Sequence, residues 1–510
     1  MDKSRLTDNF QKFNDATDRF YAKELSVKDY KGISGGMGSY AQKGASASMV
    51  RLRLAGGRIT REKLAFICDC IDLYKPSMVH LTTCQSVQLH NLGPEAVKAI
   101  VGAAPEHGIF TYGGGGDYPR NVTATPLAGL IPASRIDVTP YAQAVEEYLM
   151  DFSFGRKLPR KLKVGFTCTK ENITDATARD LGFVATENGL FDVYSGGGLG
   201  RNPKLGLLVA EAVDPSEVFA YANAMFRLFM ACGNYEDRSK ARVRYMRDTL
   251  GDDAYKARFL ELVRENLSDP EFPRCDVRPV PVTKKGDGSV PSSERAKPQS
   301  QEGLFYVIYH PIGGDPSPLK FQEILNVVAD MDQVEIRISP NQTLYVVNLT
   351  GAEADRVAEV TSDGARTVFE SSVTCVGASI CQVGLRDSSG LLRSLIEMER
   401  RRGFADKVLP MIRISGCANS CAAHQLGTVA LAGSAPVDGE PAFTVFVNGS
   451  HILGKEKLGL EMGSVKVSEL PAFFEAIGDA VVASGLGSFR EWYNGDPARL
   501  SAACERYLRN

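Results

Sequence analysis

Four cysteines in two close pairs could hold an inorganic centre. Cys375 and Cys381 have five residues between them, and Cys417 and Cys421 have three. Iron–sulfur clusters are usually bound by four cysteine thiolates. Zinc also accepts four cysteines, but familiar structural zinc sites have about two residues inside each pair. The spacing therefore favours a cluster over zinc, and also over four inert buried thiols, although cysteine is often simply buried.

The residues around the second pair, in SGCANSC, are small or polar. Ala418, Asn419 and Ser420 leave room for a bulky group between the two cysteines. In a helix, positions i and i+4 share a face, so a helical conformation here would point both sulfurs the same way.

Basic residues at strand spacing form a second set of candidates. Lys161 and Lys163 in PRKLK would lie on one side of a strand, as would Arg51 and Arg53 in RLRL. Paired ammonium groups suit a multiply charged anion and depress each other's pKa, which aids proton donation. Paired guanidinium groups suit carboxylates. Taken alone, both pairs also fit solvated strand residues.

The composition excludes several other classes of protein. The 510 residues are 44% hydrophobic and 24% charged, with a net charge of −2, so neither nucleic acid nor a membrane surface is expected as a partner. No apolar stretch reaches about 18 residues, and the polar first thirty residues do not resemble a signal peptide. An odd count of 11 cysteines fits a reducing, cytoplasmic compartment.

The chain contains two internal duplications. A shift of 257 positions aligns Gly56-Gly57 with Gly313-Gly314 and Gln85 with Gln342, within a shared strand–turn–helix–strand pattern. A second repeat relates 181–206 to 426–459, which share LG-x-VA, F-x-V and a glycine turn. The pattern predicts an α+β fold in the order A–B–A′–B′.

The predicted boundaries follow these repeats and a stretch rich in Pro, Ser, Lys and Gly. They are an N-terminal arm (1–48), half domain A (49–108), domain B (109–268), a linker (269–302), half domain A′ (303–365) and domain B′ (366–510). The arm is expected to lie over the surface or on a partner subunit. Only B′ carries the cysteine quartet, and B carries the basic residues instead.

Seven stretches together resemble the signature motifs of the sirohaem-dependent sulfite and nitrite reductases, from about residue 49 onward and in that family's order. They are RLRLAGGRIT, TTCQSVQLHNL, GDYPRNVTATPLAG, PRKLK, GGGLGRNP, VTCVGASICQ and SGCANSCAAHQLG. The resemblance implies two ferredoxin-like half domains and two sirohaem-reductase-type α/β domains.

The resemblance also assigns roles to individual residues. It implies that the four cysteines bind a [4Fe–4S] cluster and that Cys421 is also the axial ligand of sirohaem. Substrate binding and protonation fall to Arg120, Lys161 and Lys163. The residues implied to bind the cofactors are Arg51, Arg53, Gln85, Asn121, Gly197, Gly198, Arg201 and Asn419. The glycines would let the backbone approach a ring edge closely.

Two positions depart from the family pattern. Cys84 precedes Gln85 where the family has Arg, which removes a positive charge from the substrate pocket. Ala418 replaces a Pro and is expected to alter only local stiffness. Lys163 favours sulfite as substrate, whereas Cys84 and the sequence SCAAHQ favour nitrite.

The expected function is therefore the six-electron reduction of a small oxyanion, with sulfite to sulfide favoured over nitrite to ammonia. No nucleotide-binding fingerprint is present, so a ferredoxin or a separate reductase subunit is expected to supply the electrons. Two other classes stay open: a corrin-pathway oxygenase relative, and a non-enzymatic iron–sulfur redox protein. A non-enzymatic redox protein would give no role to the basic residues.

Overall fold

The computed structural model describes residues 6–509, and the chain divides into two compact units. The large unit contains the described chain up to Gly198 and the segments Lys204–Tyr309 and Pro316–Ser362. The small unit contains Leu199–Pro203, His310–Asp315 and the described chain from Asp363 onward. Each unit has its own sheets and its own buried core.

The large unit contains the duplicated half domain. Its first copy consists of β1 (Ser39–Ala41), β2 (Ser48–Leu52), η2 (Ala55–Gly57), β3 (Arg58–Ile59), α3 (Arg61–Tyr74), β4 (Met78–Leu81), β5 (Val87–Leu92) and α4 (Pro94–Ala103). Its second copy consists of β11 (Ala296–Pro298), β12 (Phe305–Tyr309), α9 (Pro318–Val328), β13 (Glu335–Ile338), β14 (Leu344–Leu349) and α10 (Gly351–Val360). The offset of 257 relates β1 to β11, β2 to β12, β4 to β13 and β5 to β14. The predicted α+β duplication is confirmed.

The two copies share one apolar core. Ile67 on α3 and Ile324 on α9 occupy matching positions, and both are fully buried in the same cluster. Strand β3 of the first copy also pairs with β13 of the second, with Ile59 opposite Ile336. Burying these faces against each other removes apolar surface that each copy would otherwise expose to water.

Two equivalent glutamines cross between the copies. The Gln85 side-chain amide donates to the Ile338 carbonyl (2.7 Å), and the Gln342 amide donates to the Leu81 carbonyl (2.9 Å). Both side chains are fully buried, so these bonds satisfy groups that would be costly to bury unpaired.

The described part of the N-terminal arm packs on the first half domain. It forms α1 (Thr7–Tyr21) and α2 (Val27–Ser34) before β1 pairs with β2. Phe13 on α1 is fully buried in the core of the half domains, and the Tyr21 hydroxyl donates to Ser48 Oγ (2.9 Å). The arm therefore adds strand β1 to the sheet of the first half domain, and its helices α1 and α2 pack on that half domain.

Besides the two half-domain sheets, β1-β2-β5-β4 and β11-β12-β14-β13-β3, the large unit contains a third sheet in the order β10-β9-β8-β7-β6. This sheet domain consists of β6 (Thr123–Ala124), α5 (Thr139–Ser153), β7 (Val164–Thr167), β8 (Leu181–Ala185), β9 (Phe191–Ser195), β10 (Leu207–Val213), α6 (Val218–Cys232), α7 (Arg244–Leu250) and α8 (Asp252–Ser268). Strands β6, β7 and β8 are parallel, and β9 and β10 return antiparallel.

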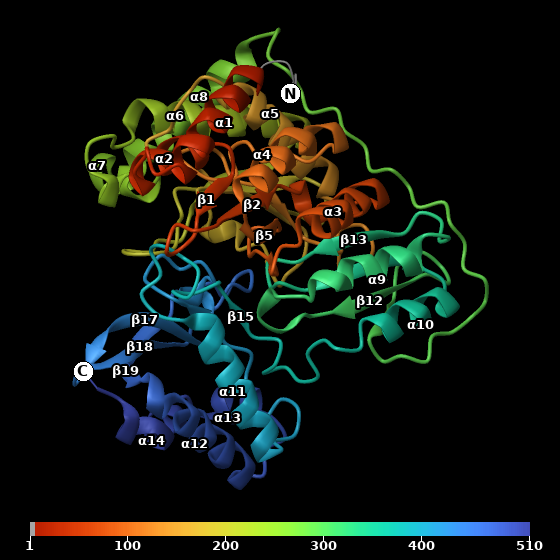
Figure 1. The fold of residues 1–510 in the computed structure, drawn as a ribbon, viewed down its shortest axis with the longest axis vertical. Helices are drawn as coiled ribbons and strands as arrows, with labels where there is room; N and C mark the ends of the chain where they lie inside the picture. Colours follow the sequence, from red (N-terminus) through yellow and green to blue (C-terminus); the bar gives the residue numbers. More distant parts are fainter. Residues whose placement is uncertain (1–5, 510) are drawn as a thin grey trace. The chain divides into compact units, whose positions relative to one another are not determined.

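The small unit repeats that sheet. It consists of β15 (Val373–Thr374), α11 (Ser388–Arg402), β16 (Arg413–Ser415), β17 (Val429–Val437), β18 (Glu440–Val447), β19 (Leu460–Lys466), α12 (Leu470–Ala483), α13 (Phe489–Gly495) and α14 (Ala498–Cys504). The order β15-β16-β17-β18-β19 has the same two parallel and two antiparallel pairings. Helices α11 to α14 gather beside the sheet (Figure 1), and their apolar residues form its core with Leu431 and Phe443.

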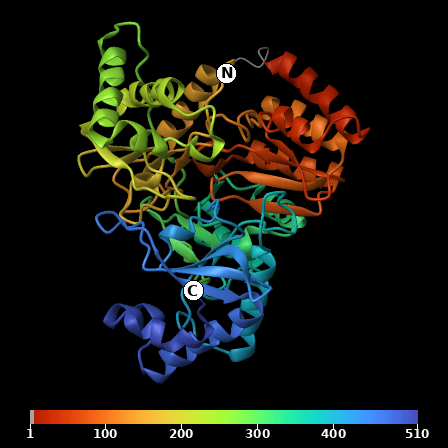
Figure 2. The same cartoon turned by 90° about the vertical axis from the view of Figure 1, so that its left-hand side faces the viewer.

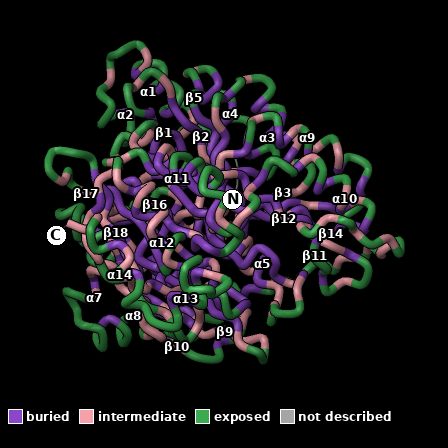
Figure 3. Tube along the Cα trace, turned by 90° about the horizontal axis from the view of Figure 1, so that it is seen from below, coloured by how far each residue is buried: buried purple, intermediate pink, exposed green. Residues whose placement is uncertain are grey.

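Residues 269–295, between α8 and β11, contain no helix or strand. Figure 1 shows this segment as a long green trace, and Figure 2 gives the turned view of the same cartoon. The view coloured by burial shows many exposed residues at the chain's periphery (Figure 3). Among the described helices, none is long and apolar enough to cross a membrane.

Candidate active site

The predicted cationic residues lie at one edge of the sheet in the large unit. Lys161 and Lys163 immediately precede β7, and Arg179 and Asp180 immediately precede the parallel strand β8. Strand β9 runs antiparallel to β8, so the glycine turn that follows β9 reaches the same edge. This amino-terminal edge of the sheet therefore gathers residues from several loops.

Asp180 organises this edge. Its side chain is fully buried, accepts from the Lys163 backbone N–H (2.7 Å) and receives two bonds from Arg242 Nη2 (3.0 Å each). Arg179 Nε donates to the Thr174 carbonyl (2.7 Å). Sequence reasoning missed Arg179, Asp180 and Arg242, although Arg179 and Asp180 directly precede the repeated LG-x-VA motif.

Cys84 lies in the turn between β4 and β5, and its neighbours fix that turn. Gln85 has a left-handed backbone (φ 57°), and its amide bonds the Ala124 backbone in both directions, at 2.8 Å each. Asn121 Nδ2 donates to the Cys84 carbonyl (2.8 Å). Gln85 and Asn121 thus have clear positioning roles; their contact with a cofactor stays a prediction.

The charges around Cys84 are mostly positive. Burial alone would raise the pKa of the Cys84 thiol, but Lys163, Arg179, Arg51 and Lys161 together lower it to about 6. A thiol in this setting is mostly thiolate at neutral pH. Cys84 therefore lies with the basic residues named from the sequence.

The Arg120 guanidinium is engaged by a glycine-rich loop. Its Nη1 donates to the carbonyls of Gly115 (2.8 Å) and Tyr118 (3.1 Å), and Nη2 donates to Gly116 (2.8 Å). Burial, partly offset by Tyr40, lowers the pKa of Arg120 to about 10. Arg120 thus holds the loop, and its predicted role toward the substrate is not tested by these contacts.

Arg51 and Arg53 have different environments. Arg51 is half-buried and its Nη1 donates to the Gly114 carbonyl. Arg53 is 3% exposed and forms a buried ion pair with Glu146 (2.7 Å), while its buried Nη2 makes no hydrogen bond within the described chain. An unsatisfied buried guanidinium nitrogen is costly, and a ligand carboxylate would satisfy it.

The glycine turn after β9 approaches the backbone closely. A Cβ on Gly197 would lie 2.6 Å from the Arg179 carbonyl oxygen, and Gly196 has φ 77°. Only glycine fits such an approach without displacing the chain. Gly197 and Gly198 belong to the large unit, whereas Arg201 belongs to the small unit.

The cysteine quartet lies in two loops at the opposite edge of its own sheet. Cys375 directly follows β15, and Cys417 comes just after the parallel strand β16, with Thr374 opposite Ile414. The carboxyl ends of adjacent parallel strands meet at one edge, where ligands of α/β sheets commonly bind. All four cysteines are free thiols.

Backbone contacts join the two cysteine loops. The Gly416 N–H donates to Cys375 Sγ (3.2 Å), and the Gly416 carbonyl accepts from Arg386 N–H (2.8 Å). Burial and then the neighbouring Cys421 raise the pKa of Cys375 to about 12; burial also raises that of Cys417, which has Cys421 and Cys381 as charged neighbours. The four thiols are therefore electrostatic neighbours.

The helical conformation considered for SGCANSC is wrong. Residues 417–421 form turns, and Ser420 has a left-handed backbone (φ 53°) that a helix cannot contain. Asn and Ser stabilise turns through local hydrogen bonds. Gln425 supports this turn, since Ser420 Oγ donates to its side chain, and the Gln425 amide donates to the Gly200 carbonyl (3.1 Å).

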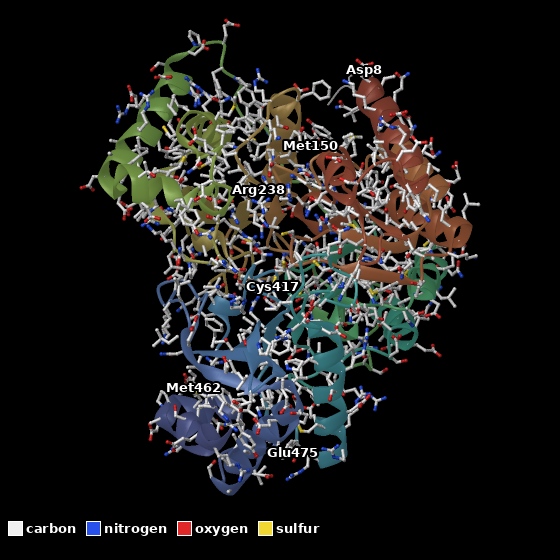
Figure 4. The ribbon with its side chains drawn as sticks, turned by 60° about the vertical axis from the view of Figure 1, so that its left-hand side comes forward. Asp8, Met150, Arg238, Cys417, Met462 and Glu475 are labelled. Carbon is white, nitrogen blue, oxygen red and sulfur yellow. The ribbon has the colours of Figure 1, made fainter. Side chains whose placement is uncertain are left out.

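The loops suit a multinuclear centre chemically. A thiolate set with a backbone N–H donor to sulfur is typical of iron–sulfur sites. Among the residues that the structure describes, no three His, Cys, Asp or Glu converge as ligands of one metal ion. Figure 4 labels Cys417 on these loops, with Met462 on β19 and Glu475 on α12 in the same unit.

Two family profiles match the chain. The profile described as "Nitrite/Sulfite reductase ferredoxin-like half domain" matches residues 40–106, and "Nitrite and sulphite reductase 4Fe-4S domain" matches 115–270. The second match covers the sheet domain with the basic edge, whereas the cysteine quartet lies in the other copy.

Several curated proteins and one solved structure are similar over most of the chain. The sulfite reductase [NADPH] hemoprotein beta-component of Chromohalobacter salexigens is 26% identical over 76% of this chain and 73% of its own length. That of Bacillus pumilus is 26% identical over 86% of this chain and 84% of its own length. The Mycobacterium tuberculosis NirA structure has a TM-score of 0.77 with 24% identity, over 92% of this chain and 91% of that one, so the fold is shared. The ferredoxin-like half domains and their duplication are thereby confirmed, and over the matched residues the chain is similar to the nitrite and sulfite reductases, which are oxidoreductases.

Proposed function

We propose that this protein reduces a small oxyanion by six electrons, and that sulfite, reduced to sulfide, is its substrate. The basic edge of the large unit supports this proposal most, because the charges of Lys161, Lys163 and Arg179 all act on the position of Cys84. A small anion is the natural ligand of such a group of cations. The relatives named as sulfite reductase components support the same substrate class.

The cysteine quartet is proposed to bind a [4Fe–4S] cluster. Cys375 and Cys381 would hold it from one loop and Cys417 and Cys421 from the other, with Asn419 beside Cys417. The Gly416 N–H bond to Cys375 Sγ would stabilise the thiolate and tune the cluster's potential.

The second proposed cofactor is sirohaem, with Cys421 as the axial ligand. When bound, sirohaem supplies an iron that holds the oxyanion while electrons arrive singly. The half-buried Arg51, and Arg53 with its unsatisfied Nη2, fit the carboxylates of such a macrocycle. Gly197 and Gly198 would admit the ring edge, and Arg201 would add a further cation.

The residues of the basic edge would bind the oxyanion and deliver protons. Lys161 and Lys163 carry exchangeable protons that can leave with oxygen as water. Arg120 keeps the Gly115–Gly116 loop in place through its carbonyl bonds. Nitrite is the second candidate substrate, favoured by the negative charge that Cys84 adds to this edge.

Electrons are proposed to come from a separate protein, either a ferredoxin or a reductase subunit. The relatives are named as beta-components, which agrees with a second subunit in those enzymes. The domain boundaries predicted from the sequence and a cytoplasmic location are also proposed.

The test is the visible spectrum of the purified protein together with steady-state rates. Sirohaem bands with a cluster shoulder, and methyl-viologen-driven turnover with a higher kcat/KM for sulfite than for nitrite, are expected. A cluster spectrum without a haem band would contradict the reductase proposal and favour the non-enzymatic redox protein. A haem-containing protein that reduces neither anion would favour the corrin-pathway oxygenase relative.

Cys421→Ser tests the axial assignment. The substitution is expected to abolish turnover and to change the haem spectrum, since a hydroxyl is a poor substitute for the thiolate ligand. Retained methyl-viologen-driven turnover would show that Cys421 is not the axial ligand. Cys504→Ser, at a buried thiol of the same unit, is the matched control and should leave the spectrum unchanged.

A further inference from the structure

Cys84 is placed beside the lysine strand by a continuous series of contacts. Its carbonyl accepts from Asn121, and the adjacent Arg120 N–H donates to the Leu162 carbonyl (2.8 Å). Leu162 separates Lys161 from Lys163. The turn that carries Cys84 and the strand end that carries the two lysines are thus joined through residues 120 and 121.

Other cations reach the same place from separate elements. Arg51 comes from β2, opposite Gln88 on the strand that follows the Cys84 turn. Arg179 comes from the loop before β8, where a Cβ on Gly165 would lie 3.4 Å from its side chain. The cations that act electrostatically on Cys84 therefore come from two loops and a strand.

The acidic side chains described near this edge are paired with arginines: Asp175 lies 4.0 Å from Arg179, and Asp117 accepts from Arg160 and Arg238. Asp180 is committed to Arg242 and to the Lys163 backbone. Arg120, in turn, has Cys84 among the neighbours that favour its charged form, after Tyr40. Cys84 therefore adds a negative charge to a group of cations whose neighbouring carboxylates are themselves paired with arginines.

We propose that Cys84 sets the charge of the oxyanion pocket in this chain, so that the pocket selects a singly charged oxyanion over a doubly charged one. The proposal rests on the reductase function and defines its substrate more closely. Sulfite would be taken as the monoanion hydrogensulfite, and nitrite, which is already a monoanion, would also bind.

The selectivity follows from Coulomb's law. The repulsion between Cys84 and a bound anion is proportional to the anion's charge, so removing it helps a dianion twice as much in free energy as a monoanion. Expressed as affinities, the gain for the dianion is the square of the gain for the monoanion. Lowering the pH through the titration of Cys84 has the same effect as removing the charge.

The first experiment measures the charge of Cys84 directly. The as-isolated protein is alkylated with iodoacetamide between pH 4 and 9, and peptide mass spectrometry reads Cys84 separately from Cys168. Cys84 should react with an inflection near pH 6, whereas burial raises the pKa of Cys168 to about 11. An inflection for Cys84 above pH 8 would overturn the proposal.

The second experiment measures anion selectivity in Cys84→Ser, with Cys168→Ser as the matched control. Dissociation constants for nitrite and sulfite at pH 8 are taken from the visible spectrum. Cys84→Ser should tighten sulfite on the order of tenfold and nitrite about threefold, and the control should change neither. Equal changes for the two anions would overturn the proposal.

Failure of the reductase function is distinguishable from failure of this proposal. If the protein holds no haem, the reductase function fails, and selectivity is read on the wild type from protection of Cys84 against iodoacetamide. Nitrate, a monoanion, should then protect at lower concentration than sulfate, a dianion. The opposite order would overturn the charge-setting role of Cys84.

Discussion

The two sheet domains have the same topology but place their chemistry at opposite edges. In the large unit, Lys161 and Lys163 precede β7, at the amino end of the parallel strands. In the small unit, Cys375 and Cys417 follow β15 and β16, at the carboxyl end. The copies therefore diverged by using different loops of one scaffold, with little change to the sheet itself.

The strand registers identify the counterpart of each residue. Gly165 pairs with Gly182 in the large unit, and Arg413 pairs with Ala430 in the small unit, at the same steps of the sheet. This register shifts the correspondence predicted from the LG-x-VA repeat by three residues. Counting from these pairs, Lys163 corresponds to Met411, and Cys417 corresponds to Thr169. Each of these two candidate site residues thus has a counterpart without a charge or a thiol in the other copy. Replacing the residue by its counterpart is a test of its role.

Replacing Cys417 by its counterpart should have the largest effect. Cys417→Thr removes one of four cluster thiolates, so iron and inorganic sulfide content should fall to background, and activity should be lost. Chemical analysis of the purified variant measures both. The reverse change, Thr169→Cys, should leave both contents unaltered. A full complement of iron in Cys417→Thr would mean that the small unit does not use this residue.

Replacing Lys163 by its counterpart should have the next largest effect. Lys163→Met keeps an unbranched side chain one atom shorter but removes the charge and the proton, so kcat/KM should fall about 100-fold. The iron content should stay at the wild-type level, which separates this loss from the one caused by Cys417→Thr. Lys170→Met, at an exposed lysine beyond the other end of β7, is the control. A fall of less than about twofold would show that the basic edge is not the substrate side.

The smallest expected effect concerns the helix that follows the first strand of each sheet. Helices α5 and α11 both have 15 residues, and their twelfth residues are the buried Met150 and Glu399. Burial, together with Glu370 and Asp406, raises the pKa of Glu399 to about 7, above the ordinary value of 4.5. The contribution of neutral Glu399 to the free energy of unfolding is therefore complete below pH 4.5. It is lost as the pH rises through 7, and the free energy of unfolding falls by about 3 kcal/mol.

Urea unfolding measured by fluorescence of Trp492, the single tryptophan, reports on the small unit. Between pH 5 and 8 the free energy of unfolding should fall more in the wild type than in Glu399→Gln. Equal falls in the two proteins would contradict the assignment. Glu397→Gln, on an exposed position of the same helix, is the control.

The sequence predicted those features that depend on local pattern. The 257-residue repeat and the cysteine spacing could be read directly because each is a short-range regularity. The pairing of Arg53 with Glu146 could not, since 93 residues separate them and only the packing of α5 brings them together. The same holds for Arg242 and Asp180, which are 62 residues apart.

The turn at Cys417–Cys421 shows a different limit. The spacing of four residues between Cys417 and Cys421 fits a helix and a turn equally well. Ser420 and its neighbours favour the turn. Side chains that bond their own backbone compete with helix formation. Here the left-handed conformation of Ser420 ends any helix before Cys421.

The crossed glutamines of the half domains have the form of a contact across a twofold axis. Gln85 reaches the Ile338 carbonyl as Gln342 reaches that of Leu81, and residues 81 and 338 are themselves equivalent under the repeat. In a symmetric dimer each such bond would occur twice between identical subunits. The single chain thus preserves an isologous interface whose two sides can now mutate separately. The repeat accordingly has Cys84 beside Gln85 and Asn341 at the equivalent position beside Gln342.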